Sequence, residues 1–278
     1  MTLENLTIII TTFKSYDVIK PCIESIDTKV KILVIENSRD LNFKNEIEKK
    51  YKNVLCILTG ENIGYAKSNN LGLSKVKTKY ALILNPDTII KKNSLENFLI
   101  TASQHPNFSL IGPFLGQENK FLKNNNDKVK EVNSIKGFAI FLNINKFNDD
   151  FFDENYFLYF EEIDLCKKVI KENGKIFLDT SIEIEHKESK SVSTNNSIEL
   201  EKNRNWHWMW STFYFHKKHF GFFIALIKIF PKLVSALLKF LFYYFFKKND
   251  LKEIYFSRLS GIINSILGRK SWYRPSLD

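Results

Sequence analysis

Short apolar runs alternate with segments of helical periodicity along the first part of this chain. The apolar runs, each five residues long, cover 6–10, 31–35, 54–58 and 80–84. The segments between them, 15–27, 43–52 and 65–75, predict helices, and Val18, Cys22 and Ile26 recur every four residues in the first. Strands that alternate with helices predict an α/β fold with a mostly parallel, doubly wound sheet flanked by helices.

The run Tyr80–Leu84 leads into a polar corner, Asn85-Pro86-Asp87-Thr88. Five consecutive apolar residues are typical of a strand that is buried on both faces of a parallel sheet. Pro86 has no N–H to donate, so the strand should end there and the chain should turn. Asp87 would then stand at the carboxyl end of a central strand, where open α/β sheets bind ligands. A simple turn or helix cap before Leu95 is the alternative, because these residue types are common in turns.

Beyond residue 90 the alternation is less regular. We expect a helix at 94–104, a short strand at 109–111, a polar surface loop at 116–131, a strand at 135–141 and a helix at 161–173. Extended segments at 175–179 and 182–185 follow, and His186 comes directly after them. Gly137, inside the predicted strand, marks a place where a ligand or another backbone segment approaches closely. We interpret residues 1–200 as one domain and residues 201–278 as an extension.

The extension is aromatic, apolar and basic. Residues 220–246 are strongly apolar, but three lysines and Pro231 interrupt them, so the segment lacks the 20 or so uncharged residues of a spanning helix. Pro231 should split the segment into two helices. A basic stripe is predicted on one helix face, and this pattern is typical of a segment that lies in a membrane interface. Its residues are Lys217, Lys228, Lys232 and Lys239. Ordinary helices packed on the domain, or a transmembrane helix, remain the alternatives.

The charge is distributed unevenly along the chain. The net charge is +10, yet residues 1–201 carry 27 lysines and arginines against 28 acidic residues, whereas residues 202–278 carry 14 against 3. The basic excess therefore belongs to the extension, and we expect residues 203–248 to meet an anionic membrane surface. The three cysteines, Cys22, Cys56 and Cys166, are isolated, which favours core positions in a reducing cytoplasm. The N-terminus does not resemble a signal peptide. We therefore expect a cytoplasmic protein, peripheral on the inner face of the cell membrane.

Polar residues gather where the predicted strands end, and their types suit a nucleotide bound through its base, ribose and diphosphate. They are Thr11-Thr12-Phe13, Glu36-Asn37, the stretch from Asn62 to Asn69, and Asn85-Pro86-Asp87. No G-x-G-x-x-G follows the first strand and no P-loop motif is present, which disfavours dinucleotide oxidoreductases, common methyltransferases and P-loop NTPases. A diphosphate without a glycine cradle needs a cation, and one divalent ion held by few carboxylates would serve.

In their order, these motifs resemble family 2 glycosyltransferases. Thr-Thr-Phe, Glu-Asn-Ser and Glu-Asn-Ile-Gly-Tyr-Ala-Lys-Ser-Asn-Asn-Leu-Gly are similar to the nucleotide-sugar half of that family. Leu-Asn-Pro-Asp-Thr resembles the form that its metal motif takes in a rhamnosyltransferase-like branch. The segment Phe157–Cys166 resembles the acidic acceptor-side motif of that branch, and His186 with Ser189 and Ser191 resembles its late histidine segment. The resemblance covers about residues 5–192.

The resemblance implies a GT-A fold, with a nucleotide-sugar half at 1–112 and an acceptor half at 113–200, and an inverting transfer from a nucleotide-diphosphate sugar. The implied nucleotide-site residues are Thr11, Thr12, Phe13, Glu36, Asn62, Gly64, Lys67, Asn69 and Asn85. Asp87 would hold Mg²⁺ or Mn²⁺ on the diphosphate, with His186 as a further ligand. Glu162, where an aspartate is more usual, would be the general base, with Glu161 beside it as the alternative.

The implied partners are a dTDP- or UDP-linked sugar, with rhamnose as one candidate, and a glycan or polyprenyl-linked acceptor in surface polysaccharide synthesis. Two other functions remain open. The glutamate at position 162 is also compatible with a non-catalytic glycan-binding relative. The basic and aromatic extension would suit a nucleic-acid-binding module, but that leaves the acidic strand ends unexplained, so we expect no nucleic acid.

Overall fold

The computed structural model describes residues 2–114, 128–186 and 197–274. The chain forms two compact units. The α/β unit comprises Met1–Asp153 and Glu162–Ser193, and the helical unit comprises Glu154–Glu161 and Thr194–Asp278. Each unit is described by itself.

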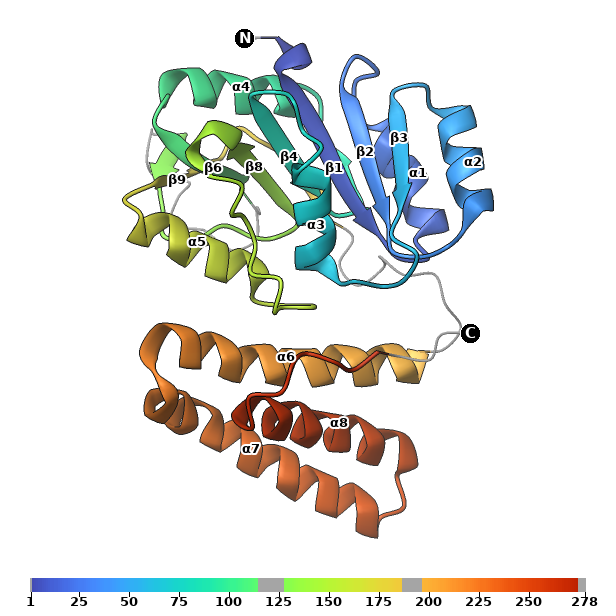
Figure 1. Ribbon diagram of the computed structural model, residues 1–278, viewed down its shortest axis with the longest axis vertical. Coiled ribbons are helices and arrows are strands. Elements are labelled where there is room, and N and C mark those ends of the chain that lie inside the picture. Colours follow the sequence, from blue (N-terminus) through green and yellow to red (C-terminus); the bar gives the residue numbers. More distant parts are fainter. Residues whose placement is uncertain (1, 115–127, 187–196, 275–278) are drawn as a thin grey trace. The chain divides into compact units, whose positions relative to one another are not determined.

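An eight-stranded sheet forms the centre of the α/β unit, with the strand order β3-β2-β1-β4-β8-β6-β9-β7 (Figure 1). Its first four strands in space, β3, β2, β1 and β4, run parallel, whereas β8 is antiparallel to both neighbours. The strands are β1 (Leu6–Thr12), β2 (Lys31–Glu36), β3 (Val54–Leu58), β4 (Tyr80–Leu84), β6 (Phe108–Pro113), β7 (Val129–Glu131), β8 (Ala139–Asn143) and β9 (Lys175–Asp179). The predicted mostly parallel α/β sheet is thus confirmed.

Helices cover both faces of this sheet. They are α1 (Tyr16–Glu24), α2 (Leu41–Lys50), α3 (Tyr65–Leu73), α4 (Ser94–Gln104) and α5 (Glu161–Lys171), with short 3₁₀ turns at Leu3–Asn5 and Ile144–Lys146. One face packs on α1, α2 and α4 through a continuous apolar core, in which the rings of Phe98 and Phe141 stack with centroids 4.9 Å apart. On the other face, α3 lies so close to β1 that a Cβ at Gly72 would come within 2.7 Å of Ile9.

Several boundaries differ from the prediction. β1 continues through Thr11 and Thr12, which were expected in a loop, because both still pair with β2 at Ile35 and Glu36. β8 begins at Ala139 and not at residue 135. The expected loop 116–131 falls outside the described residues up to 127, and its last three residues form β7. The three cysteines are buried and unbridged, as predicted.

A second, two-stranded sheet was not predicted. It consists of β5 (Thr88–Ile90) and β10 (Ile184–His186), which run antiparallel with His186 opposite Thr88. His186 is therefore the last residue of a strand and does not simply follow one. Three-residue strands carry too little periodicity to be recognised in a sequence, since their pairing comes from a partner nearly 100 positions away.

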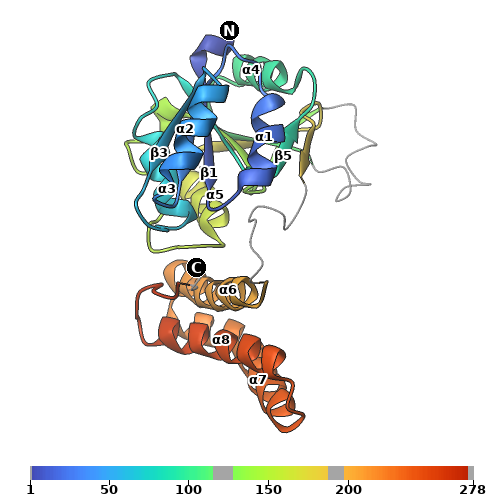
Figure 2. The same ribbon diagram turned by 90° about the vertical axis from the view of Figure 1, so that its right-hand side faces the viewer.

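The helical unit is built from α6 (Ser197–Phe220), α7 (Phe222–Phe245) and α8 (Asn249–Ile266). In both views α7 lies beside α8 (Figure 2). Its core includes Phe213 from α6, Ile229 from α7 and Ile262 from α8. The backbones of α6 and α8 approach each other closely at Gly261, where an added Cβ would collide with the carbonyl oxygen of Trp206.

Two expectations for this unit are wrong. Pro231 does not divide the segment, since α7 continues through it. Apolar packing on both sides of Pro231, by Ile229 and Ala236, outweighs the roughly 3 kcal/mol cost of an interior proline. The helix break lies instead at Gly221, whose φ of 86° suits glycine. Lys217 therefore belongs to α6, and the four lysines do not form one stripe.

Among the described helices, none combines the length and the apolar character that crossing a bilayer requires.

Candidate active site

The turn after β4 fixes Asp87 at the carboxyl end of a central strand. The backbone N–H of Asn85 donates to the carbonyl oxygen of Phe138 at 2.9 Å, which completes the β4–β8 pairing. The hydroxyl of Thr88 then donates to the carbonyl oxygen of Asn85 at 2.7 Å and closes the turn around Pro86. Asp87 is held between these bonds and is only 3% exposed.

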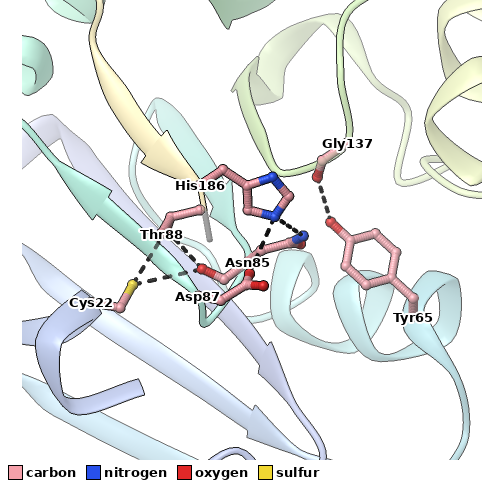
Figure 3. A network of polar contacts seen from close by, with 7 residues as sticks. All are labelled: Cys22, Tyr65, Asn85, Asp87, Thr88, Gly137 and His186. Carbon is pink, nitrogen blue, oxygen red and sulfur yellow. Dashed lines mark hydrogen bonds and ion pairs between the residues drawn. The ribbon is translucent and has the colours of Figure 1, made fainter. Parts of the chain in front are cut away.

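The small sheet delivers His186 to this turn. Its Nε2 lies 3.3 Å from Oδ1 of Asp87 and 3.5 Å from Nδ2 of Asn85 (Figure 3). The imidazole stacks on the ring of Phe138 with centroids 4.8 Å apart, which fixes its orientation. The structure therefore brings together Asn85, Asp87 and His186, three residues that the sequence singled out and that span about 100 positions.

Asp87 has a carboxylate oxygen that finds no hydrogen-bond partner in the described part of the chain. Its Oδ1 is buried and accepts no hydrogen bond within the described residues. A buried carboxylate oxygen is costly unless a cation or donor meets it. A carboxylate and an imidazole nitrogen are suitable ligands for Mn²⁺, and hard cations of this kind take their remaining ligands from phosphate oxygens and water. No group of three or more potential ligand side chains occurs in the described ranges, so any ion here would rely on such outside ligands.

Cys22 lies beneath the turn. Its Sγ is 3.5 Å from the hydroxyl of Thr88 and 3.7 Å from the carbonyl oxygen of Asn85 (Figure 3). Burial raises the pKa of the Cys22 thiol to about 11, so it stays protonated at neutral pH. Its contacts support the turn.

The ends of β1 and β2 carry a second polar network. The hydroxyl of Thr12 donates to a carboxylate oxygen of Glu36 at 2.5 Å, and the backbone N–H of Lys14 approaches the other oxygen at 3.4 Å. The hydroxyl of Thr11 donates to Oδ1 of Asn69 at 3.0 Å. Ile10 pairs with Leu84 in parallel register, so the next residues, Thr11 and Asn85, stand at the same level. The parallel strand ends thus place this network at the same sheet edge as Asp87.

The loop before α3 is organised by Asn37, which the sequence analysis placed among the polar strand ends but to which it gave no role in the site. Its Oδ1 accepts hydrogen bonds from the hydroxyl of Ser68 at 2.7 Å and from the backbone N–H of Ile63 at 3.3 Å. Asn62 accepts from the N–H of Gly64 at 3.1 Å, and Gly64 is the N-cap residue before α3, with a φ of 86°. The position of Asn37 directly after Glu36, at a strand end, was the available signal.

Two predicted residues make fewer contacts. Phe13 is partly exposed just beyond β1, and Lys67 is exposed on the surface of α3. Ser189 and Ser191 lie outside the described residues.

Glu162, the predicted general base, lies in the first turn of α5. A Cβ at Gly137 would lie 3.3 Å from both Cγ and Cδ of Glu162, so the carboxylate side chain rests on the glycine backbone. The close approach predicted at Gly137 is therefore confirmed. The carbonyl oxygen of Gly137 accepts from the hydroxyl of Tyr65 at 2.9 Å (Figure 3). The next residue, Phe138, stacks on His186. Glu162 is thus linked to the Asp87 turn through two neighbouring residues.

The electrostatics of the two glutamates differ. Burial raises the pKa of Glu162, while the backbone N–H groups of Glu162 and Ile163 and the charge of Lys136 oppose this. Glu161 instead acts on Tyr159, whose pKa is raised to about 12, mainly by burial and also by this carboxylate. Glu162 remains partly accessible, so it can meet a substrate hydroxyl.

A family model shows which family the chain belongs to, and one curated protein is similar to it. The family model described as glycosyl transferase family 2 matches residues 7–165, which is more than half of the chain. The low-salt glycan biosynthesis hexosyltransferase Agl10 of Haloferax volcanii is 26% identical over 200 residues. That match covers 63% of this chain and 64% of Agl10, so the chain spans less than two thirds of this relative's length.

Solved structures share the fold at low sequence identity. Mannosyltransferase PcManGT from Pyrobaculum calidifontis, in complex with GDP-Man and Mn²⁺, matches with a TM-score of 0.58 and 9% identity over 96% of this chain and 88% of that one. GalNAc-T7 with UDP, GalNAc and Mn²⁺ matches with a TM-score of 0.55 and 11% identity over 65% of this chain and 42% of that one. These likenesses confirm the GT-A fold.

Proposed function

The chain belongs to the glycosyl transferase family 2, and from this we propose that it transfers a sugar from a nucleotide-diphosphate donor to an acceptor hydroxyl, with inversion at the anomeric carbon. The observation that carries the proposal is the buried Oδ1 of Asp87. It has no hydrogen-bond partner among the described residues and faces His186 at 3.3 Å.

Asp87 and His186 would hold Mg²⁺ or Mn²⁺ against the donor diphosphate, with Asn85 beside them. Both solved structures named above contain Mn²⁺, one together with GDP-Man and the other with UDP and GalNAc. A bound divalent ion would stabilise the negative charge that develops on the leaving nucleotide diphosphate.

The network at the ends of β1 and β2 would bind the base and ribose. Thr11, Thr12, Glu36 and Asn69 are already ordered by their mutual hydrogen bonds, so little side-chain freedom is lost when the nucleotide binds. Asn62 and Gly64 shape the neighbouring loop, and Phe13 and Lys67 border it on the exposed side.

Glu162 would be the general base. The acceptor oxygen attacks the anomeric carbon, the bond from that carbon to the diphosphate oxygen breaks, and the hydroxyl proton passes to the Glu162 carboxylate. The electron pair of the broken bond leaves with the nucleotide diphosphate. We favour Glu162 over Glu161 because its side chain rests on Gly137, whose neighbour Phe138 contacts His186.

The donor and the acceptor are proposed only as classes. A UDP- or dTDP-linked hexose, with rhamnose among the candidates, would be the donor. A glycan or a polyprenyl-linked glycan, as in surface polysaccharide synthesis, would be the acceptor. The similarity to a hexosyltransferase of glycan biosynthesis supports this choice.

A thermal-shift panel of nucleotide sugars, with and without Mn²⁺, tests the proposal most directly. A donor at about 100 times its dissociation constant should raise the melting temperature by roughly 5 to 10 °C. Asp87→Asn should abolish the Mn²⁺-dependent part of this shift, whereas Asp27→Asn, which removes an exposed carboxylate on the α/β unit, should leave it unchanged. Donor hydrolysis or transfer is then measured with the stabilising sugar.

Three results would contradict the proposal. Full transfer in the presence of a chelator would exclude the metal. A shift that is equal in Asp87→Asn would exclude the site. Tight donor binding with neither hydrolysis nor transfer to any glycan acceptor would favour the non-catalytic alternative.

A further inference from the structure

The helix α7 leaves a continuous apolar face uncovered. Twelve of its large apolar residues are exposed, and eight of these lie within an arc of about 100° around the helix axis. The eight are Phe223, Ile227, Phe230, Val234, Leu237, Leu238, Leu241 and Phe245. Phe223, Ile227 and Phe245 are 80%, 73% and 75% exposed, so water meets nearly the whole side chain. An exposed apolar face of this extent marks an interaction surface.

This face is distinct from the one that packs inside the helical unit. The buried residues of α7 are Ala225, Ile229 and Ala236, which contact α6 and α8. At 100° per residue these three lie roughly 140° from the centre of the exposed arc. The internal core of the unit is therefore complete without the exposed face.

The charges of residues 202–248, which include the whole of α7, are all of one sign, and acidic residues return in α8 at Asp250 and Glu253. Residues 202–248 contain nine lysines and arginines and no aspartate or glutamate. Lys232 and Lys239 lie over the rings of Trp208 and Tyr255 at 5.4 and 5.3 Å, on the flank of the helix away from the apolar arc. Lys217 lies before the N-terminus of α7, and Lys247 and Lys248 follow its C-terminus. The apolar face is thus bracketed by cations.

The exposed apolar face and the positive charges together favour one occupant of this surface. A second copy of the chain would bring two all-cationic segments together, which like-charge repulsion opposes. An acyl-chain boundary accepts aromatic and aliphatic side chains, and anionic headgroups attract the lysines at both ends. We propose that α7 docks lengthwise on an anionic lipid bilayer. The arc from Phe223 to Phe245 would lie in the acyl boundary, and the lysines at the two ends of the helix would meet the headgroups.

Flotation of the full-length protein with lipid vesicles tests this docking. It should bind vesicles of mixed phosphatidylglycerol and phosphatidylcholine, and bind vesicles of phosphatidylcholine alone more weakly. Binding to the anionic vesicles should fall with salt. Phe230→Glu with Leu238→Glu, both 61% exposed, should weaken binding about 100-fold or more. Lys247→Gln with Lys248→Gln should weaken it about 25-fold on anionic vesicles only.

A matched control uses the same chemistry elsewhere. Leu41 and Ile100 are 63% and 50% exposed on helices of the α/β unit. Leu41→Glu with Ile100→Glu should leave vesicle binding unchanged. All variants replace exposed side chains, so their thermal melts should match the wild type, and the donor-induced thermal shift provides a readout that does not depend on lipid.

A fluorescent label reports the orientation of the helix. Burial raises the pKa of Cys22 to about 11 and of Cys56 and Cys166 to about 12, so an added exposed cysteine is labelled selectively near neutral pH. Phe230→Cys lies in the arc, and Ser235→Cys lies about 140° away on an exposed face. An environment-sensitive dye should brighten on anionic vesicles at position 230 and not at position 235.

The possible results separate the alternatives. Salt-sensitive binding that is lost in the arc variant and retained in the control supports the docking. Equal binding to neutral and anionic vesicles, equal loss in the control variant, or equal brightening at both labelled positions overturns it. No vesicle binding, with a dimer in solution that the arc variant dissociates, would assign the face to a second copy. Loss of sugar transfer without loss of vesicle binding would concern the proposed catalysis alone.

Discussion

Replacing Gly137 by alanine should slow catalysis without unfolding the protein. Gly137 does not need the left-handed backbone conformation, so alanine is tolerated there. The new methyl group would lie 3.3 Å from Cγ and Cδ of Glu162 and 3.4 Å from its Cβ. Carbon atoms prefer about 3.5–4.0 Å, so the carboxylate side chain must retreat by about 0.4 Å.

The size of the effect follows from this displacement. A misplacement of about 1 Å in an active site costs about 100-fold in rate. Scaled to 0.4 Å, that penalty is about 2-fold if it grows with the square of the displacement and about 6-fold if it grows linearly. The variant should therefore lose about 2- to 6-fold in kcat. Its unfolding free energy should change by less than about 1 kcal/mol, because the lost freedom of the unfolded chain offsets the tight contact.

Steady-state release of nucleotide diphosphate gives kcat and the KM for the donor. The KM for the donor should stay unchanged, since Gly137 contacts Glu162, the proposed general base, and not the network at the ends of β1 and β2. The decisive comparison is the double variant with Glu162→Gln. If Gly137 acts through the Glu162 carboxylate, adding alanine to Glu162→Gln should not reduce its residual rate further. An additional 2- to 6-fold loss in that background would refute the reasoning, as would a raised donor KM with normal kcat.

Three further predictions concern the pH profile, the metal and the core. Burial raises the pKa of Glu162, and the general base must be ionised, so kcat/KM should rise with pH through a value above the ordinary 4.5. The charge of Lys136 lowers this pKa, so Lys136→Met should move the rise in kcat/KM to higher pH. An unchanged profile in that variant would show that another group titrates. His186→Ala should raise the Mn²⁺ concentration needed for half-maximal donor stabilisation about tenfold or more, measured by thermal shift, and an unaltered Mn²⁺ titration would remove His186 from the site. Phe141→Ala should lower the unfolding free energy of the α/β unit by about 3–5 kcal/mol in urea, because the ring is fully buried and stacked on Phe98; a loss below 1 kcal/mol would mean that the core collapses around the gap.

The sequence was most informative where long apolar runs end in polar residues. Tyr80–Leu84 and Asn85-Pro86-Asp87 predicted a strand and a turn, and β4 with its turn matches them because burial on both faces leaves little choice. Thr12 and Glu36 were expected at one edge, and their hydrogen bond places them there. Parallel strands bring such ends together, whatever the sequence distance between them.

The features that escaped prediction depend on partners far away in the chain. β5 exists because β10 pairs with it, and neither three-residue strand has a pattern of its own. Asn37 acts through Ser68 and Ile63, so its role appears only when β2 and α3 are placed side by side. Pro231 was expected to break a helix, but local propensity yields when packing on both sides favours continuity.

The pairing of β5 with β10 also sets an order of assembly. During synthesis the Asp87 turn, with Cys22 and Thr88 beneath it, emerges almost 100 residues before His186. The edge of the sheet that we propose to bind the nucleotide can therefore form while the chain is still short, but His186, the proposed second metal ligand, reaches it only when β10 closes a very long loop. A chain truncated before residue 184 would retain the strand ends that are proposed to bind the nucleotide, but it would lack the imidazole of His186. Asp87 and His186 therefore come together only after nearly all of the α/β unit has been synthesised.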